Sequence, residues 1–177
     1  YNNIFIMSAH HQLIHLCEHA LKHSYNKLIL LYDIDMFIKH YKEKLDWNKV
    51  ISDAQEFNLT RPVYYTLYFT KRMLGTPIPD SVLSLLKPKR FSFLEKRFIK
   101  AVLNGRRRAG ISYAVYLAMN RTLFDKIRFI LRTFLPPQNA MGQLRNLEPI
   151  KINPSHYLVR IYRGFSYSFK VAQSLII

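Results

Sequence analysis

Asp33 and Asp35 form the carboxylate pair with the clearest chemical meaning in this sequence. On a β-strand, residues i and i+2 point to the same face, so the two carboxylates could hold one Mg²⁺ ion against the phosphates of a nucleotide. Such a site also needs a glycine-containing turn for the phosphates, about ten residues earlier. That position reads Lys22-His23-Ser24-Tyr25, and all five glycines lie at or after Gly75. The pair alone is therefore a weak indication of a metal site.

The segment that contains this pair, residues 28–41, has the periodicity of a helix. Apolar residues recur on one expected face, at Leu30, Ile34, Phe37 and Tyr41. On a helix the directions of Asp33 and Asp35 differ by about 200°, so the two side chains cannot grip one ion. We expect Asp33 to lie largely buried at the edge of the apolar face. We expect Asp35 to be exposed beside Lys39, one turn later.

Histidines recur at every fourth position of the preceding segment and form a stripe on the expected helix, at His11, His15, His19 and His23. Histidines at this spacing can bind zinc, but such a site needs a further ligand, and no H-E-x-x-H arrangement supplies a general base. The alternative is structural, because a buried carboxylate needs a hydrogen-bond partner. We therefore expect a polar network of His15, His19 and Asp33, and no metal.

A basic loop is the best candidate for a binding site. Arg106, Arg107 and Arg108 lie between glycines, directly before an expected helix start, and Arg97 and Lys100 precede them. Guanidinium groups form paired hydrogen bonds to phosphate, and a helix N-terminus adds backbone donors. The pattern indicates an anion-binding site for a nucleotide, a nucleic acid or a lipid phosphate. The alternative is a solvated turn between two helices.

Net charge is distributed unevenly along the 177 residues. Residues 1–88 carry 10 Lys and Arg against 8 Asp and Glu, whereas residues 89–177 carry 17 against 3. The second half is therefore expected to face phosphate, an acidic partner or an anionic lipid surface, although a merely solvated face has the same composition. The single cysteine excludes an internal disulfide and suggests a reducing, cytoplasmic location. No run is long and apolar enough to predict a transmembrane segment.

The rest of the sequence shows the periodicity of successive helices. It predicts an all-α fold, a multi-helix bundle of about seven helices. Helix ends are marked by capping and stop residues, at Ser8, Asp46, Gly75, Ser92 with Glu95, and Asn104. A long helix is expected from Ser112 to about Phe134. We expect a helical bundle over 1–135 and a basic tail over 136–177 that packs on the same domain and ends in an amphipathic helix.

The run SAHHQLIHLCEHALKHSYNKLILLYDIDMFI resembles the start of the C-terminal half of a family of uncharacterised nucleotidyltransferases. The resemblance continues through LDWNKVISDAQEFNLTRPVYYTLYFTKRMLGTPIPDSVLSLLKP. It reaches FLPPQNAMGQLR and HYLVRIYRGF near the end of the chain. The order and spacing of these motifs carry the resemblance, which spans nearly the whole chain.

The resemblance implies a helical accessory region whose partner is an N-terminal nucleotidyltransferase-like core. It would pack on that core and help to position an anionic substrate, without turnover of its own. The Gly-Ser turn, the paired aspartates, Mg²⁺ and a nucleoside triphosphate would belong to the core, so we expect no cofactor and no catalytic residue in this chain. The alternative is a stand-alone basic module that binds nucleic acid, another polyanion or an anionic membrane surface. A third is an enzyme that uses Asp33 and Asp35 directly. The sequence leaves the oligomeric state open.

Overall fold

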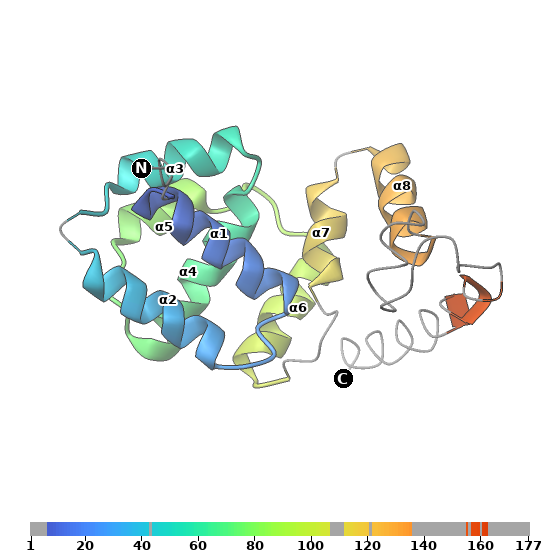
Figure 1. Ribbon diagram of the computed structural model, residues 1–177, viewed down its shortest axis with the longest axis horizontal. Coiled ribbons are helices and arrows are strands. Elements are labelled where there is room, and N and C mark those ends of the chain that lie inside the picture. The colour runs from blue at the N-terminus through green and yellow to red at the C-terminus, as the bar shows by residue number, and fades with distance from the viewer. Residues whose placement is uncertain are drawn as a thin grey trace, which may run out of the picture. The chain divides into compact units, whose positions relative to one another are not determined.

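The computed structural model describes residues 7–42, 44–106, 112–120 and 122–135, together with 155, 157–159 and 161–162. Within these residues the chain forms eight helices of at least seven residues and no β-strand, which confirms the all-α prediction. The helices, drawn in Figure 1, are α1 (Ala9–Lys22), α2 (Ile29–His40), α3 (Trp47–Glu56), α4 (Thr60–Leu74), α5 (Asp80–Leu86), α6 (Phe93–Leu103), α7 (Tyr113–Met119) and α8 (Leu123–Phe134).

Contacts divide the chain into two compact units, Tyr1–Val115 and Tyr116–Ile177. The boundary that we expected near residue 135 stays a prediction, because most of residues 136–177 lie outside the described part of the chain. The described residues between 155 and 162 are helical, at the place where the final amphipathic helix is expected to begin.

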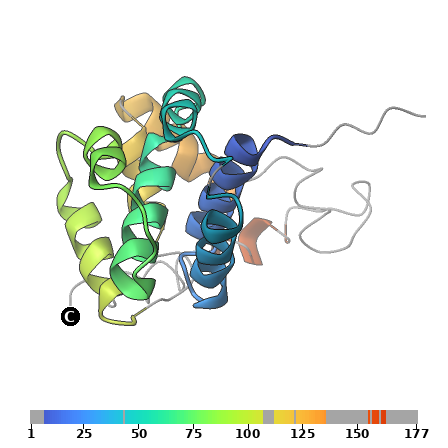
Figure 2. The same ribbon diagram turned by 90° about the vertical axis from the view of Figure 1, so that its left-hand side faces the viewer.

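Helix α4 is the central element of the first unit and packs against α1, α2, α3 and α5 (Figure 2). Nearly every residue from Pro62 to Thr70 is buried, as expected for a helix that is surrounded by others. Its rings join a buried aromatic cluster in which the centroid distances are 5.1 Å for Tyr25–Phe69 and 5.5 Å for Tyr65–Phe98. Such edge-to-face pairs each add about 0.5–1.5 kcal/mol beyond the burial of the rings. The cluster ties α6 and the turn after α1 to α4.

The helix ends follow the capping residues of the sequence. The Ser8 hydroxyl accepts a hydrogen bond from the His11 N–H, and the Asp46 carboxylate accepts from the N–H groups of Asn48 and Lys49. Ser92 and Glu95 form the expected capping box at the start of α6. Gly75 ends α4 in the left-handed conformation, with φ of 69°.

The long helix expected from Ser112 to Phe134 is interrupted, and this prediction is wrong. The chain forms α7 and α8 instead, with a break after Met119. Two side chains stabilise the break. The Asn120 amide donates to the Tyr116 carbonyl, and the Thr122 hydroxyl accepts from the Asp125 N–H to cap α8. The threonine is therefore the N-cap of a second helix and not an interior residue of one long helix.

Candidate functional site

The two carboxylates of α2 lie in environments opposite to those expected. Asp35 is buried, only 3% exposed, whereas Asp33 is exposed. Asp35 Oδ1 accepts a 2.6 Å hydrogen bond from Thr76 Oγ1, and Oδ2 accepts a 2.8 Å hydrogen bond from Lys39 Nζ. The helix itself and the pairing of Asp35 with Lys39 are confirmed. The predicted burial of Asp33 and exposure of Asp35 are wrong.

The error comes from which side of α2 faces the core. The buried side chains are those of Leu31, Ile34, Asp35 and Ile38. At 100° per residue this buried face is rotated by about 80° from the one expected from the sequence. Apolar residues occur almost all round α2, so both faces satisfy the periodicity of an amphipathic helix.

The charge state of Asp35 follows from its partners. Burial raises the pKa of this carboxyl, but the hydrogen bonds from Lys39 and Thr76 and the positive charge of Lys39 outweigh burial, and the pKa lies below its usual value. Asp35 is therefore an ionised structural group, and Asp33 points away from it. The pair does not fit a shared Mg²⁺ ion. Across the described residues, no group of three or more His, Cys, Asp or Glu side chains could hold a metal ion.

The histidine stripe lies on the exposed side of α1. The ring centroids are 6.3 Å apart for His15 and His19, and 4.5 Å apart for His19 and His23. The structure shows no hydrogen bond between Asp33 and either His15 or His19 in the region it describes, where all three side chains are exposed. The expected polar network is thus not formed. Asp33 lies on the solvent side of α2.

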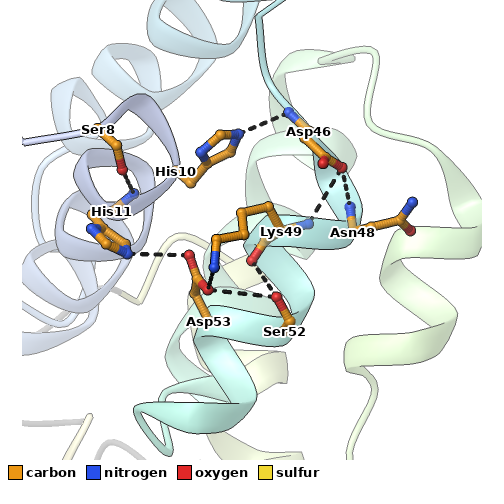
Figure 3. A network of polar contacts seen from close by, with 8 residues as sticks. All are labelled: Ser8, His10, His11, Asp46, Asn48, Lys49, Ser52 and Asp53. Carbon is orange, nitrogen blue, oxygen red and sulfur yellow. Dashed lines mark hydrogen bonds and ion pairs between the residues drawn. The ribbon is translucent and has the colours of Figure 1, made fainter.

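A polar network that the sequence did not reveal joins the start of α1 to α3 (Figure 3). Asp53 is buried on α3 and pairs with Lys49 Nζ at 2.7 Å and with His11 Nε2 at 3.2 Å. Oδ2 of Asp53 has no partner with hydrogen-bond geometry among the described residues, and His11 Nε2 is its neighbour at 3.2 Å. The hydrogen bond from Lys49 holds the pKa of Asp53 below its usual value and raises the pKa of Lys49. Lys49 and Asp53 both lie on α3, so the contact of His11 with Asp53 is the one that joins α1 to α3. Because Lys49 already neutralises Asp53, this carboxylate is not a free general base.

The neighbouring histidine makes a different contact with the same helix. His10 Nε2 accepts a 3.0 Å hydrogen bond from the backbone N–H of Asp46, the N-cap of α3 (Figure 3). One sequence signal could have revealed part of the network. Asp53 follows Val50 by three residues on the apolar face of α3, and a buried carboxylate there requires a cation nearby.

A third buried carboxylate joins α4 to α6. Glu95 Oε1 accepts hydrogen bonds from Arg61 Nε at 2.8 Å and from the Tyr65 hydroxyl at 2.7 Å, while Oε2 accepts from the Ser92 N–H at 2.8 Å. Burial raises the pKa of Glu95, but these donors outweigh burial and hold the pKa below its usual value. Burial and the adjacent carboxylate raise the pKa of Tyr65, so its hydroxyl stays protonated as a donor. These hydrogen bonds hold α6 against α4 in the helical unit.

The basic loop is held at both of its ends. On one side Gly105 is left-handed, with φ of 74°, and the Arg106 N–H donates to the Ala101 carbonyl at 2.8 Å. On the other side the hydroxyls of Ser112 and Ser24 lie 2.9 Å apart in a buried contact. The two residues that flank the loop, Arg106 and Ser112, are therefore both bonded to the first unit.

The predicted anion-binding residues are only partly described. Lys100 and Arg106 are exposed, and Arg97 is half-buried with its guanidinium carbon 5.2 Å from the ring centroid of Phe93. Arg107 and Arg108 lie outside the described residues. Lys100 and Arg97 follow each other by one turn of α6, just before the loop. Arg97 and Lys100 thus lie on the helix that precedes the loop, and Arg106 lies at the start of the loop.

Comparison with known families gives one match. Residues 1–75 match a family described as uncharacterised nucleotidyltransferase. The match ends at Gly75, the residue that terminates α4, and so includes α1 to α4. No curated protein and no solved structure matches the chain. The expected resemblance to this family is therefore confirmed over residues 1–75.

The nucleotidyltransferase match divides the candidate features into two groups. The histidine stripe, Asp35 with its partner Lys39, and the Asp53 network lie inside it. Glu95, the basic loop and α8 lie beyond it.

Proposed function

We propose that this chain is the helical accessory region of a nucleotidyltransferase-like protein, which packs on an α/β catalytic core and positions an anionic substrate. The match of residues 1–75 to the family carries the proposal. Those residues fold into the helices that surround and include α4, and the acidic pair within them does not form a metal site. The catalytic carboxylates and the Mg²⁺ that they bind would come from the core.

An exposed apolar stripe on α2 and the turn before it supports docking on that core. It consists of Leu28, Ile29, Tyr32 and Met36, whose side chains are 46–51% exposed. These residues lie on one side of the helix, within an arc of about 100° that begins next to Asp35 at the edge of the buried face. Large apolar side chains gathered on one exposed face are typical of a protein–protein contact. We assign the catalytic core to this stripe because the stripe lies inside the family match.

The basic loop supplies the anion-binding part of the proposal. Arg97, Lys100 and Arg106 are cations on or next to α6, while Glu95, the acidic residue beside them, is buried and bonded to Arg61. The electrostatic potential around these three cationic side chains is therefore positive. We expect Arg107 and Arg108, which follow Arg106 in the sequence, to bind a phosphate group through their guanidinium groups.

The coding region directly upstream of Tyr1 tests the docking proposal. We expect it to encode, in the same reading frame, a Gly-Ser turn followed by two aspartates separated by one residue. A stop codon in frame shortly before Tyr1 would contradict the accessory role. It would favour the stand-alone basic module.

A polyanion titration tests the basic loop. We expect the chain to bind duplex DNA with a strong salt dependence and, because phosphate contacts carry no sequence information, with weak sequence preference. Replacing Arg106, Arg107 and Arg108 by Ser should weaken binding and lower the salt slope by about one unit per lost phosphate contact. The measurement is fluorescence anisotropy of a labelled duplex at several salt concentrations.

The matched control removes the same charge elsewhere, from exposed lysines of the first half, by replacing Lys27, Lys42 and Lys44 with Ser. Equal losses in the two triple variants would show that only net charge matters. That result would remove the loop from the proposal.

A further inference from the structure

Helix α8 turns its apolar side to solvent. Five large side chains along it are between 43% and 73% exposed, those of Leu123, Phe124, Ile127, Ile130 and Leu131. The opposite side carries the internal contact, because the rings of Phe129 and Tyr116 stack with centroids 6.1 Å apart. The orientation is thus the reverse of that of an ordinary surface helix, whose apolar side faces the core.

The exposed side chains form one continuous surface. At 100° per residue they fall within an arc of about 120°. Lys126 and Arg128 lie about 40° outside the two edges of this arc, one on each side. Arg132 lies further round and is exposed. The apolar surface of α8 is therefore bordered by a cation on both edges.

The one acidic residue of α8 is directed away from this surface. Asp125 lies on the far side of the helix and accepts a 2.6 Å hydrogen bond from the Thr122 hydroxyl. Its backbone N–H donates to the same hydroxyl at 3.1 Å, so the carboxylate belongs to the N-terminal cap of α8. No negative charge of the helix offsets Lys126 and Arg128 at the apolar surface.

We propose that α8 binds an anionic lipid surface and lies in the plane of the membrane interface. Its apolar arc would enter the boundary of the acyl chains, while Lys126 and Arg128 reach the lipid phosphates from the edges. The twelve residues of α8 span about 18 Å, well short of the roughly 30 Å hydrocarbon core, so the helix lies flat. No helix in the described residues is long and apolar enough to cross a membrane.

Two other occupants fit the surface less well. A nucleic acid would satisfy the cations, but its phosphate backbone leaves five large apolar side chains in water. A second copy of α8 would cover the apolar arc, but a symmetric pair brings the cationic edges of both helices together. An anionic lipid layer satisfies both the charge and the apolar area. This inference goes beyond the proposed function, because it concerns the second unit and does not require a catalytic core.

The test is co-sedimentation of the full chain with vesicles. One vesicle type contains phosphatidylcholine alone, and the other contains phosphatidylcholine mixed with phosphatidylglycerol. We expect binding to the mixed vesicles, little binding to the neutral ones, and release by salt. Ile127→Asp combined with Leu131→Asp places two charges in the centre of the arc and should weaken binding by about tenfold or more. Replacing Lys126, Arg128 and Arg132 with Gln should remove the preference for the anionic vesicles.

The matched control is Tyr32→Asp combined with Met36→Asp, which makes the same change on the exposed stripe of α2. It should bind vesicles like the wild type, and circular dichroism should show that both double variants remain helical. Equal loss in the two variants, or no binding of the wild type to anionic vesicles, would overturn the proposal. So would a dimer in sedimentation analysis that only Ile127→Asp with Leu131→Asp dissociates, because α8 would then be a self-association surface.

Discussion

Asp35 links α2 to the segment that follows α4, because its two carboxylate oxygens accept hydrogen bonds from Lys39 and from Thr76. Replacing Asp35 with Ala leaves the buried Thr76 hydroxyl without this acceptor. We expect the free energy of unfolding to fall by about 1–3 kcal/mol, as measured by urea denaturation at neutral pH. Asp33→Ala, the matched control on the exposed side of the helix, should change it by less than about 0.5 kcal/mol. Equal unfolding midpoints for the two variants would contradict the assigned roles.

Glu95 should give the helical unit a pH-dependent part of its stability. Its pKa in the folded chain lies below the ordinary value of 4.5, because the donors Tyr65, Ser92 and Arg61 outweigh the effect of burial. Its contribution is therefore fully present above pH 4.5 and is lost as the pH falls through the lower, folded-state pKa. Glu95→Gln should cost about 1.5–3 kcal/mol at neutral pH, since hydrogen bonds to a charged group are lost.

The difference in unfolding free energy between the wild type and Glu95→Gln should shrink as the pH is lowered below 4.5. Urea titrations at a series of pH values measure this difference. The exposed Glu56 provides a control, because Glu56→Gln leaves the buried cluster intact. A difference that stays constant into strong acid would show that Glu95 is not the titrating group.

At the level of elements, the end of α4 depends on a single backbone conformation. Gly75 has φ of 69°, and a Cβ atom added there would meet nothing within 4 Å. Substitution with Ala should therefore cost only the strain of a left-handed residue, about 1–2 kcal/mol. Asn should cost less than Ala, because it adopts this conformation more readily. Denaturant unfolding of both variants measures which of them is more stable. A Gly75→Ala variant more stable than the wild type would contradict the left-handed conformation of Gly75.

Helix ends were predictable from the sequence because each is decided by residues a few positions apart. Ser92 and Glu95 form their capping box within one turn, and Gly75 needs no distant partner. The face of α2 was not predictable in this way. Its apolar residues leave two possible buried faces, and the buried one makes tertiary contacts such as that of Asp35 with Thr76, 41 residues away. Sequence periodicity contains no information about that contact.

The candidate site shows the same limit at the level of the whole molecule. The uneven charge and the arginine-rich loop are visible in the sequence, because both depend on composition. The pairing of Ser24 with Ser112, which holds one end of the loop, joins residues 88 positions apart and appears only in the fold. The Asp53 network likewise depends on where α1 meets α3. The exposure of the apolar side of α8 was not predicted, because a single long helix was expected from Ser112 to about Phe134.

Binding between this chain and the proposed nucleotidyltransferase-like core is the most direct test of the proposed accessory role. Isothermal titration calorimetry with a separately produced core should give a measurable dissociation constant. Tyr32→Asp with Met36→Asp should weaken it by about tenfold or more, because the change places charges in the exposed stripe of α2. Ile127→Asp with Leu131→Asp should leave it unchanged. A core that does not bind the chain, or that binds both double variants as tightly as the wild type, would contradict the account.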